Sequence, residues 1–163
     1  NDCVVSYISY IGNNKHCDDG PAEVKYEKNN NIIYKAWHQN GKFHRLDGPA
    51  QIWYENDKVV CKSWFIEGKY HRLDGPAYIK YDKSGNIIEK RWFKEDQRHR
   101  KNGPAVIENN KGIYKMFYKN NKLHRKNKPA YIKYDESGNI IEERWYKEDK
   151  LHRKNGPAVI HYD

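Results

Sequence analysis

Residues 64–81 read WFIEGKYHRLDGPAYIKY, and this pattern recurs along almost the whole 163-residue chain. Every proline of the chain precedes an alanine, and successive prolines are separated by 28, 27, 28, 25 and 28 residues. Self-similarity at a fixed period of about 20–50 residues is the signature of a repeat architecture. The sequence therefore predicts six copies of one short unit, marked by Pro21, Pro49, Pro76, Pro104, Pro129 and Pro157.

Two other residue types recur at fixed distances before the proline. An aromatic residue stands twelve positions before it in five copies, and Ser9 takes this place in the first copy. A histidine stands five positions before the proline and is followed by arginine, except that Cys17 follows it in the first copy. These residues form a structural repeat ladder of Trp37, Trp64, Trp92, Phe117 and Trp145 with His44, His71, His99, His124 and His152.

Each unit contains two strand patterns and two turn signals. Residues 77–81 alternate in the manner of a strand, and residues 87–92 form a second run that ends on Trp92. Gly85 lies between them, and Gly68 follows the preceding tryptophan, at positions where a tight hairpin needs positive φ. The pattern predicts an all-β fold, an elongated antiparallel β-hairpin repeat array with an open solenoid-like sheet and about six repeats of 25–28 residues.

We expect residues 1–163 to form a single tandem-repeat domain. Lys128 replaces the glycine before the fifth proline, and the interval there is the shortest, which predicts a local irregularity near the fifth unit. The expected boundaries are a degenerate first repeat at 1–22, internal repeats at about 23–50, 51–77, 78–105 and 106–130, and a last repeat at 131–163.

The composition combines strong polarity with many aromatic rings. A mean hydropathy of -1.19 and a net charge of +9 favour disorder, but five Trp and fourteen Tyr at regular spacing favour a folded chain with a thin core. Residues 1–81 have a net charge of +1 and residues 82–163 have +8. The excess lies around the repeated His-Arg, so the candidate anion- or partner-binding residues are Arg98, Arg100, Lys101, Arg125, Lys126, Lys128, Arg153 and Lys154.

The role of the repeated arginines has two interpretations at this stage. A buried arginine would pair with the nearby Asp47 or Asp74, whereas exposed arginines would form a basic stripe. For the histidines we favour a hydrogen bond to the backbone of a neighbouring unit, because equivalent residues in every copy do not make one catalytic pocket. We therefore expect no enzyme activity, no catalytic residue and no cofactor.

The cysteines and the hydropathy pattern bear on the environment of the protein. Cys3, Cys17 and Cys61 are odd in number and have no metal-ligand spacing, so we expect neither a disulfide framework nor a metal site. This usage fits a reducing compartment. No apolar run is long enough to cross a bilayer as a helix, so we expect no transmembrane segment.

The units resemble MORN-like repeats, the variant MORN arrays of bacteria and of large DNA viruses. The resemblance depends on Gly-Lys-x-His after an aromatic strand, at 41–44 and 68–71, followed by a corner with glycine and a strand with tyrosine. This chain inserts Arg-x-Asp/Asn before Gly-Pro-Ala, which departs from the better-known unit. The resemblance implies a β-sheet scaffold for protein association and no catalytic residues.

We therefore expect a non-enzymatic scaffold for protein–protein association, such as a viral structural or virion-associated component, located in the cytoplasm or the virion. Two alternatives are an anion-binding module, for nucleic acid or acidic lipid, and an antitoxin- or immunity-like binding protein. The strand pattern at 158–162 is not followed by a tryptophan strand. Because unpaired strand edges favour association, we expect this strand to be completed by another copy of the chain (self-association through the C-terminal edge strand), by a different protein, or by further residues of a longer array.

Overall fold

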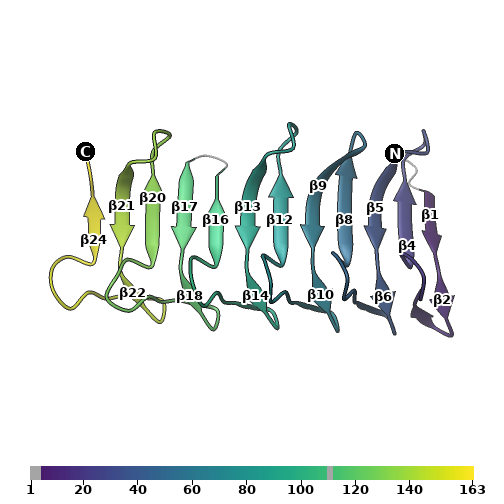
Figure 1. The fold of residues 1–163 in the computed structure, drawn as a ribbon, viewed down its shortest axis with the longest axis horizontal. Coiled ribbons are helices and arrows are strands. Elements are labelled where there is room, and N and C mark those ends of the chain that lie inside the picture. The colour runs from purple at the N-terminus through teal and green to yellow at the C-terminus, as the bar shows by residue number, and fades with distance from the viewer. Residues whose placement is uncertain (1–4, 110–111) are drawn as a thin grey trace.

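The computed structural model describes residues 5–109 and 112–163, which contain no helix. Twelve strands form one antiparallel sheet, and the first and last of them lie at opposite ends of the array (Figure 1). The predicted all-β hairpin repeat array is confirmed. In sheet order the strands are β1 (Val5–Ile8), β4 (Glu23–Tyr26), β5 (Ile32–Ala36), β8 (Gln51–Glu55), β9 (Lys58–Ser63), β12 (Tyr78–Tyr81), β13 (Ile87–Arg91), β16 (Val106–Glu108), β17 (Ile113–Met116), β20 (Tyr131–Tyr134), β21 (Ile140–Arg144) and β24 (Val159–His161).

Six small hairpins form a second row along one edge of the large sheet (Figure 1). The predicted strand ending on tryptophan is in fact divided there: β13 ends at Arg91, and a new strand begins at Phe93. A unit therefore has four strands where the sequence pattern indicated two. The hairpins are β2 (Tyr10–Ile11) with β3 (Asn14–Lys15), β6 (His38–Gln39) with β7 (Lys42–Phe43), β10 (Phe65–Ile66) with β11 (Lys69–Tyr70), β14 (Phe93–Lys94) with β15 (Gln97–Arg98), β18 (Tyr118–Lys119) with β19 (Lys122–Leu123), and β22 (Tyr146–Lys147) with β23 (Lys150–Leu151).

The backbone of the ladder aromatic joins the sheet to the hairpin row. The Trp64 N–H donates to the Ala77 carbonyl at 2.8 Å, and the Trp64 carbonyl accepts from the His71 N–H at 3.1 Å. The same two bonds recur in all six copies, with Ser9 in the aromatic place of the first. This closure explains the fixed spacing of aromatic, histidine and alanine, and it leaves Ala77 fully buried, where a larger side chain would not fit.

Successive hairpins also bond to one another. The Gly68 N–H, in one hairpin turn, donates to the Phe43 carbonyl of the preceding hairpin at 2.9 Å, and Asp96 repeats this bond to Tyr70 at 3.0 Å. Gly68 has a φ of 78°, which the turn requires. The hairpin row is thus a second hydrogen-bonded layer rather than a set of independent loops.

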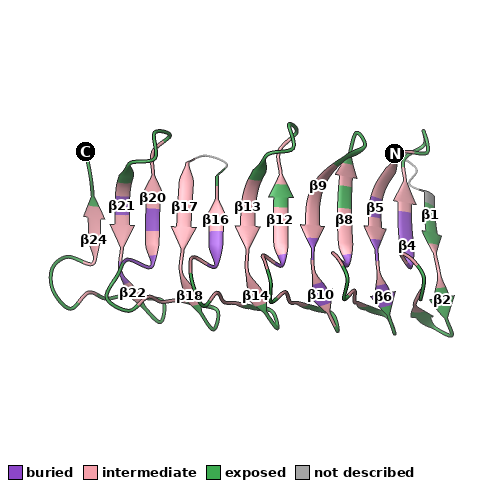
Figure 2. Ribbon diagram, in the orientation of Figure 1, coloured by how far each residue is buried: buried purple, intermediate pink, exposed green. Residues whose placement is uncertain are grey.

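The core lies where the sheet meets the hairpin row, while the turns at the opposite edge are exposed (Figure 2). In the N-terminal half it contains a continuous stack of rings, with centroid separations of 4.4, 5.2, 4.1 and 5.0 Å. Aromatic pairs at such distances add stability beyond their buried area. The stack consists of His38, Phe43, Phe65, Tyr70 and Phe93.

The expected irregularity in the fifth unit is present in two places. The β16–β17 hairpin pairs Val106 with Met116 and Glu108 with Tyr114 without a register shift, whereas β4–β5, β8–β9, β12–β13 and β20–β21 each contain one. At the corner of this unit Asn127 takes a φ of 57°, so the residue before Lys128 supplies the left-handed backbone.

Candidate functional site

We use "corner" for the six residues from the ladder histidine to the proline, and "hairpin–corner layer" for the small hairpins with their corners. In five corners the arginine guanidinium lies over the ring of the ladder aromatic of the same unit. The separation from Cζ to the ring centroid is 4.1, 4.2, 3.9, 3.7 and 3.9 Å along the chain. These separations are typical of cation–π interactions, and the attraction to the ring restrains each guanidinium. The pairs are Arg45–Trp37, Arg72–Trp64, Arg100–Trp92, Arg125–Phe117 and Arg153–Trp145.

In the second and third corners the guanidinium also binds an aspartate. Arg45 Nε donates to Asp47 Oδ1 at 2.8 Å and its Nη2 to Oδ2 at 3.4 Å. Arg72 binds Asp74 in the same side-on manner, at 2.8 and 3.5 Å. The arginine side chains are 24% exposed and the carboxylates about 80%, so these corners contain a partly buried cation beneath an exposed anion.

In four corners the arginine also donates a hydrogen bond to the carbonyl of the corner proline. Arg72 Nη1 lies 3.4 Å from the Pro76 oxygen, and the corresponding distances are 3.3 Å for Arg100, 3.2 Å for Arg125 and 3.1 Å for Arg153. The ring and the carbonyl therefore hold the arginine even in corners where asparagine replaces the aspartate. The repeated arginines are half-buried structural groups, which favours the first of the two interpretations.

The glycine of the corner makes room for this guanidinium. A Cβ at Gly75 would lie 2.9 Å from Arg72 Cζ, and one at Gly48 would lie 3.0 Å from Arg45 Cζ. Such distances are too short for ordinary packing, so a larger residue at Gly48 or Gly75 would require the guanidinium or the corner backbone to shift. In the fifth corner Lys128 stands in this place, and the arginine there has the shortest separation from its ring, 3.7 Å.

The ladder histidines contact the next hairpin turn. The Nδ1 atom of His16 accepts the Asn40 N–H, and that of His44 accepts the Glu67 N–H, both at 3.3 Å. His124 differs, because its buried Nδ1 has no hydrogen-bond partner in the described part of the chain. No group of His, Cys, Asp or Glu among the described residues could hold a metal ion. The histidines of the early copies thus contribute to the bonding between units.

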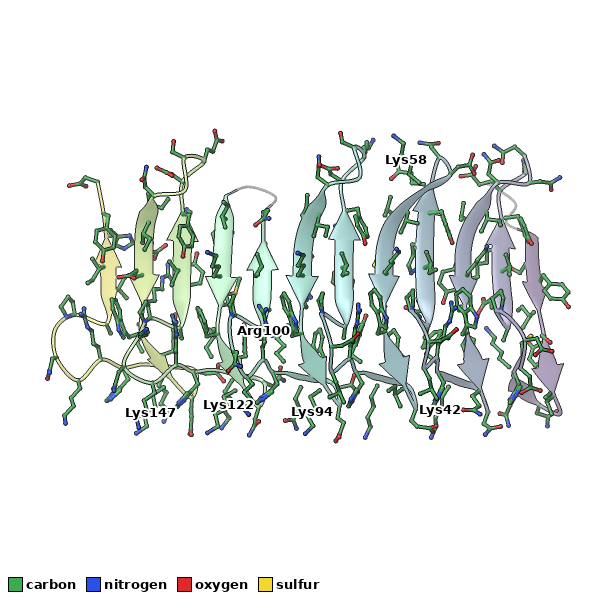
Figure 3. All side chains as sticks on the ribbon, viewed as in Figure 1. Lys42, Lys58, Lys94, Arg100, Lys122 and Lys147 are labelled. Carbon is green, nitrogen blue, oxygen red and sulfur yellow. The ribbon has the colours of Figure 1, made fainter. Side chains whose placement is uncertain are left out.

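The net charge of the protein lies in the hairpin–corner layer. Segments 10–21, 38–49, 65–76, 93–104, 118–129 and 146–157 contain 18 basic and 9 acidic residues, whereas the rest of the chain has 13 of each. The fifth segment alone has five basic residues and no acidic one, while the first has one basic and two acidic residues. Labelled lysines of this layer lie along one edge in Figure 3, opposite Lys58.

Two grooves between neighbouring corners differ in charge. The acidic groove, of about 380 Å³, lies between the first and second corners and is lined by Asp18, Asp19 and Asp47 with Arg45. The basic groove, of about 820 Å³, lies between the fifth and sixth corners and has no acidic residue in the lining that the structure describes. Its cations are Arg125, Lys126, Lys128, Lys147, Arg153 and Lys154.

The residue after the corner arginine projects into solvent and changes along the array. Leu46 and Leu73 are 79% and 82% exposed, and Lys101, Lys126 and Lys154 take this place in the later corners, also exposed. Along the row of corners, the exposed side chains are therefore first carboxylates, then two leucines and finally lysines. A partner lying along the row would meet a different surface in each half.

The candidate residues named from the sequence occupy three different places. Lys101, Lys126, Lys128 and Lys154 are exposed at the corners, while Arg100, Arg125 and Arg153 are half-buried beneath them. Arg98 lies apart, in hairpin strand β15, where its guanidinium is 5.2 Å from the Tyr118 ring and its Nε is buried without a hydrogen-bond partner in the described chain. It takes the position of Phe43 and Tyr70 in earlier units.

Lys147 lines the basic groove from hairpin strand β22 and was not among the residues predicted from the sequence. The sequence does indicate that asparagine removes an acidic neighbour of the arginine in the later copies, at Asn102, Asn127 and Asn155. The signal was present in the alignment of the copies, where Asp47 and Asp74 become asparagine. The contact between the arginine and aspartate side chains in the structure shows what this substitution changes.

Comparison of the sequence with protein-family models finds no match, and comparison with curated proteins finds none either. The described residues contain no helix long and apolar enough to span a membrane. Cys17 and Cys61 are free thiols, and Cys3 lies outside the described residues.

Proposed function

We propose that this protein is a non-enzymatic repeat scaffold that binds protein partners through its hairpin–corner layer. One observation carries the proposal: the charge excess of +9 is confined to this layer, while the remaining residues are electrically balanced. A surface with a net positive charge on a two-layer support attracts and orients a partner of opposite charge. The repeated arginines and aromatics support the fold beneath, so the exposed corner lysines are the most accessible groups for a partner.

The MORN-like resemblance supports the same proposal and extends it to a viral structural or virion-associated component, in the cytoplasm or the virion. An antitoxin- or immunity-like binding role would use the same surface. Self-association through β24 is a further part of the proposal, since β24 and β1 are the outermost strands of the sheet that the described residues form. A second copy could add its β1 to β24 and continue the antiparallel order.

A second candidate function is anion binding, for nucleic acid or acidic lipid. The basic groove favours it, because six cations converge there without a carboxylate among the described lining residues. Long-range attraction of this kind does not depend on sequence and weakens steeply with salt. Charge-reversal variants of the corner lysines therefore test both candidate functions, and the identity of the captured ligand distinguishes them.

The test is capture of partners from the native source, followed by mass spectrometry. A variant with Lys101→Glu, Lys126→Glu and Lys154→Glu should lose the captured proteins, because it reverses the exposed charge of three corners. The matched control is Lys28→Glu, Lys58→Glu and Lys83→Glu, which makes the same charge change at exposed positions outside the layer. Equal loss in both variants would contradict the assigned surface, and nucleic acid as the main captured species would favour the second candidate.

A further inference from the structure

Copies of the same corner differ in one contact that bears on ligand binding. In the second and third corners the Nε and Nη2 atoms of the arginine donate hydrogen bonds side-on to an aspartate carboxylate. The Nε–Oδ1 distances are 2.8 Å. In the fifth and sixth corners Asn127 and Asn155 replace the aspartate. There the ring and the proline carbonyl still hold the guanidinium, and its Nε–Nη2 face has no hydrogen-bond partner in the part of the chain that the structure describes.

We propose that Arg125 and Arg153, at the base of the basic groove, bind the carboxylates of an acidic polypeptide segment. The carboxylates of the segment would occupy the place that Asp47 and Asp74 occupy in the earlier corners. This inference rests on the proposed function, because it gives the hairpin–corner layer a ligand class and a site.

The internal aspartates favour a carboxylate over other anions. In the earlier corners an arginine held over the ladder ring donates through Nε and Nη2 to the two oxygens of one carboxylate. Such side-on pairs are among the stronger hydrogen-bonded contacts in proteins, and lysine cannot reproduce their geometry.

Both arginines are preorganised for this contact. Arg125 lies 3.7 Å from the Phe117 ring and donates to the Pro129 carbonyl, and Arg153 lies 3.9 Å from Trp145 and donates to Pro157. Little side-chain freedom is then lost on binding. Burial lowers the pKa of Arg125, and the negative charge of Glu143 only partly opposes this shift.

The groove can take more than one acidic residue at once. Equivalent corners lie two strand spacings apart, roughly 10 Å, which an extended chain spans with about three residues. Lys126, Lys128 and Lys154 surround the two arginines and would attract the neighbouring carboxylates. A volume of about 820 Å³ is enough for a short peptide segment rather than a single side chain.

The experiment measures binding of a fluorescent oligoglutamate peptide to the whole chain by anisotropy at low salt. Asn155→Asp supplies an internal carboxylate beside Arg153, as Asp74 does beside Arg72, and should weaken binding about tenfold. Lys83→Gln is the control, because it makes the same change of one charge at an exposed position outside the layer and should change the affinity less than about twofold.

A second variant tests the geometry of the guanidinium. Arg125→Lys with Arg153→Lys keeps the charge and removes the side-on pair, so it should also weaken binding about tenfold. Urea unfolding of this variant checks the corner, and Asn155→Asp remains informative if the lysine variant unfolds, since two native corners contain aspartate at this position. Equal affinity of Asn155→Asp and Lys83→Gln would overturn the proposal.

An oligodeoxythymidylate of matched charge is the competing probe. Tighter binding of this probe, with the same dependence on Asn155→Asp, would overturn the assignment to a polypeptide and favour nucleic acid. Absence of peptide binding at low salt would also overturn the inference. The scaffold proposal would survive that result if corner-dependent partner capture persisted.

Discussion

The acidic groove and the basic groove are built from the same corner, yet they present opposite charges. In both, a ladder aromatic supports the hairpin row, and in the second, fifth and sixth corners an arginine lies on that ring. The second corner neutralises its arginine internally with Asp47, whereas the fifth and sixth do not. A repeat can thus keep its supporting contacts and change its surface by substituting the two residues that follow the arginine.

The aromatic support should be equally important in both halves, and this has the largest expected effect. Trp64→Ala and Trp145→Ala should each lower the free energy of unfolding by about 3–5 kcal/mol, because each removes the ring beneath a guanidinium and leaves a cavity. Urea denaturation measures the loss. A cost below about 1 kcal/mol in either half would show that the ring there contributes little to the packing.

The arginine–aspartate pairs should make only the N-terminal corners sensitive to acid. Hydrogen bonds and charge from Arg45 and Arg72 lower the pKa of Asp47 and Asp74 from the ordinary value of 3.8. A lowered pKa contributes stability that is present above the ordinary value and is lost as the pH falls through the folded one.

We therefore expect Asp47→Asn with Asp74→Asn to flatten the acid limb of the stability profile below about pH 5. Urea unfolding at a series of pH values gives this profile. Asp82 and Asp135, whose pKa values asparagine contacts lower, titrate equally in both proteins and cancel in the difference. Identical acid limbs would show that the corner pairs are too exposed to contribute.

The two edge strands provide the last comparison and the smallest expected effect. The Tyr162 N–H donates to Ile141, and Ile160 pairs with Glu143, so in the alternation of an antiparallel ladder the N–H groups of Val159 and His161 face away from β21. His161→Pro should therefore block addition of a strand to β24 without removing a bond to β21.

Light scattering over a concentration series measures this association. The unmodified chain should increase in mean mass with concentration, and His161→Pro should remain monomeric. The control is Lys83→Gln, because Lys83 lies in an exposed turn far from β24. His38→Pro would be unsuitable, because His38 is buried. A strictly monomeric unmodified chain would exclude self-association through this edge.

Much of the fold could be predicted because each copy repeats the same local signals. Six copies with turn glycines and alternating strand residues indicated the antiparallel array, and the short interval before Pro129 indicated an irregularity near the fifth unit. The four-strand unit could not be predicted from Trp92, because a strand pattern does not show where the backbone turns out of the sheet. The division results from the bonds of Trp92 to Ala105 and His99, which join residues separated in the chain.

The candidate site was predictable in charge but not in arrangement. The sequence by itself determined that the positive residues accumulate after Arg98, since this needs only the order of residues. Only the tertiary structure decided that Arg125 and Arg153 are held on aromatic rings while Arg98 packs over Tyr118 between hairpins. The physical reason is that a cation's role depends on which ring, carbonyl or carboxylate the fold places within a few ångströms of it, and these partners come from different strands.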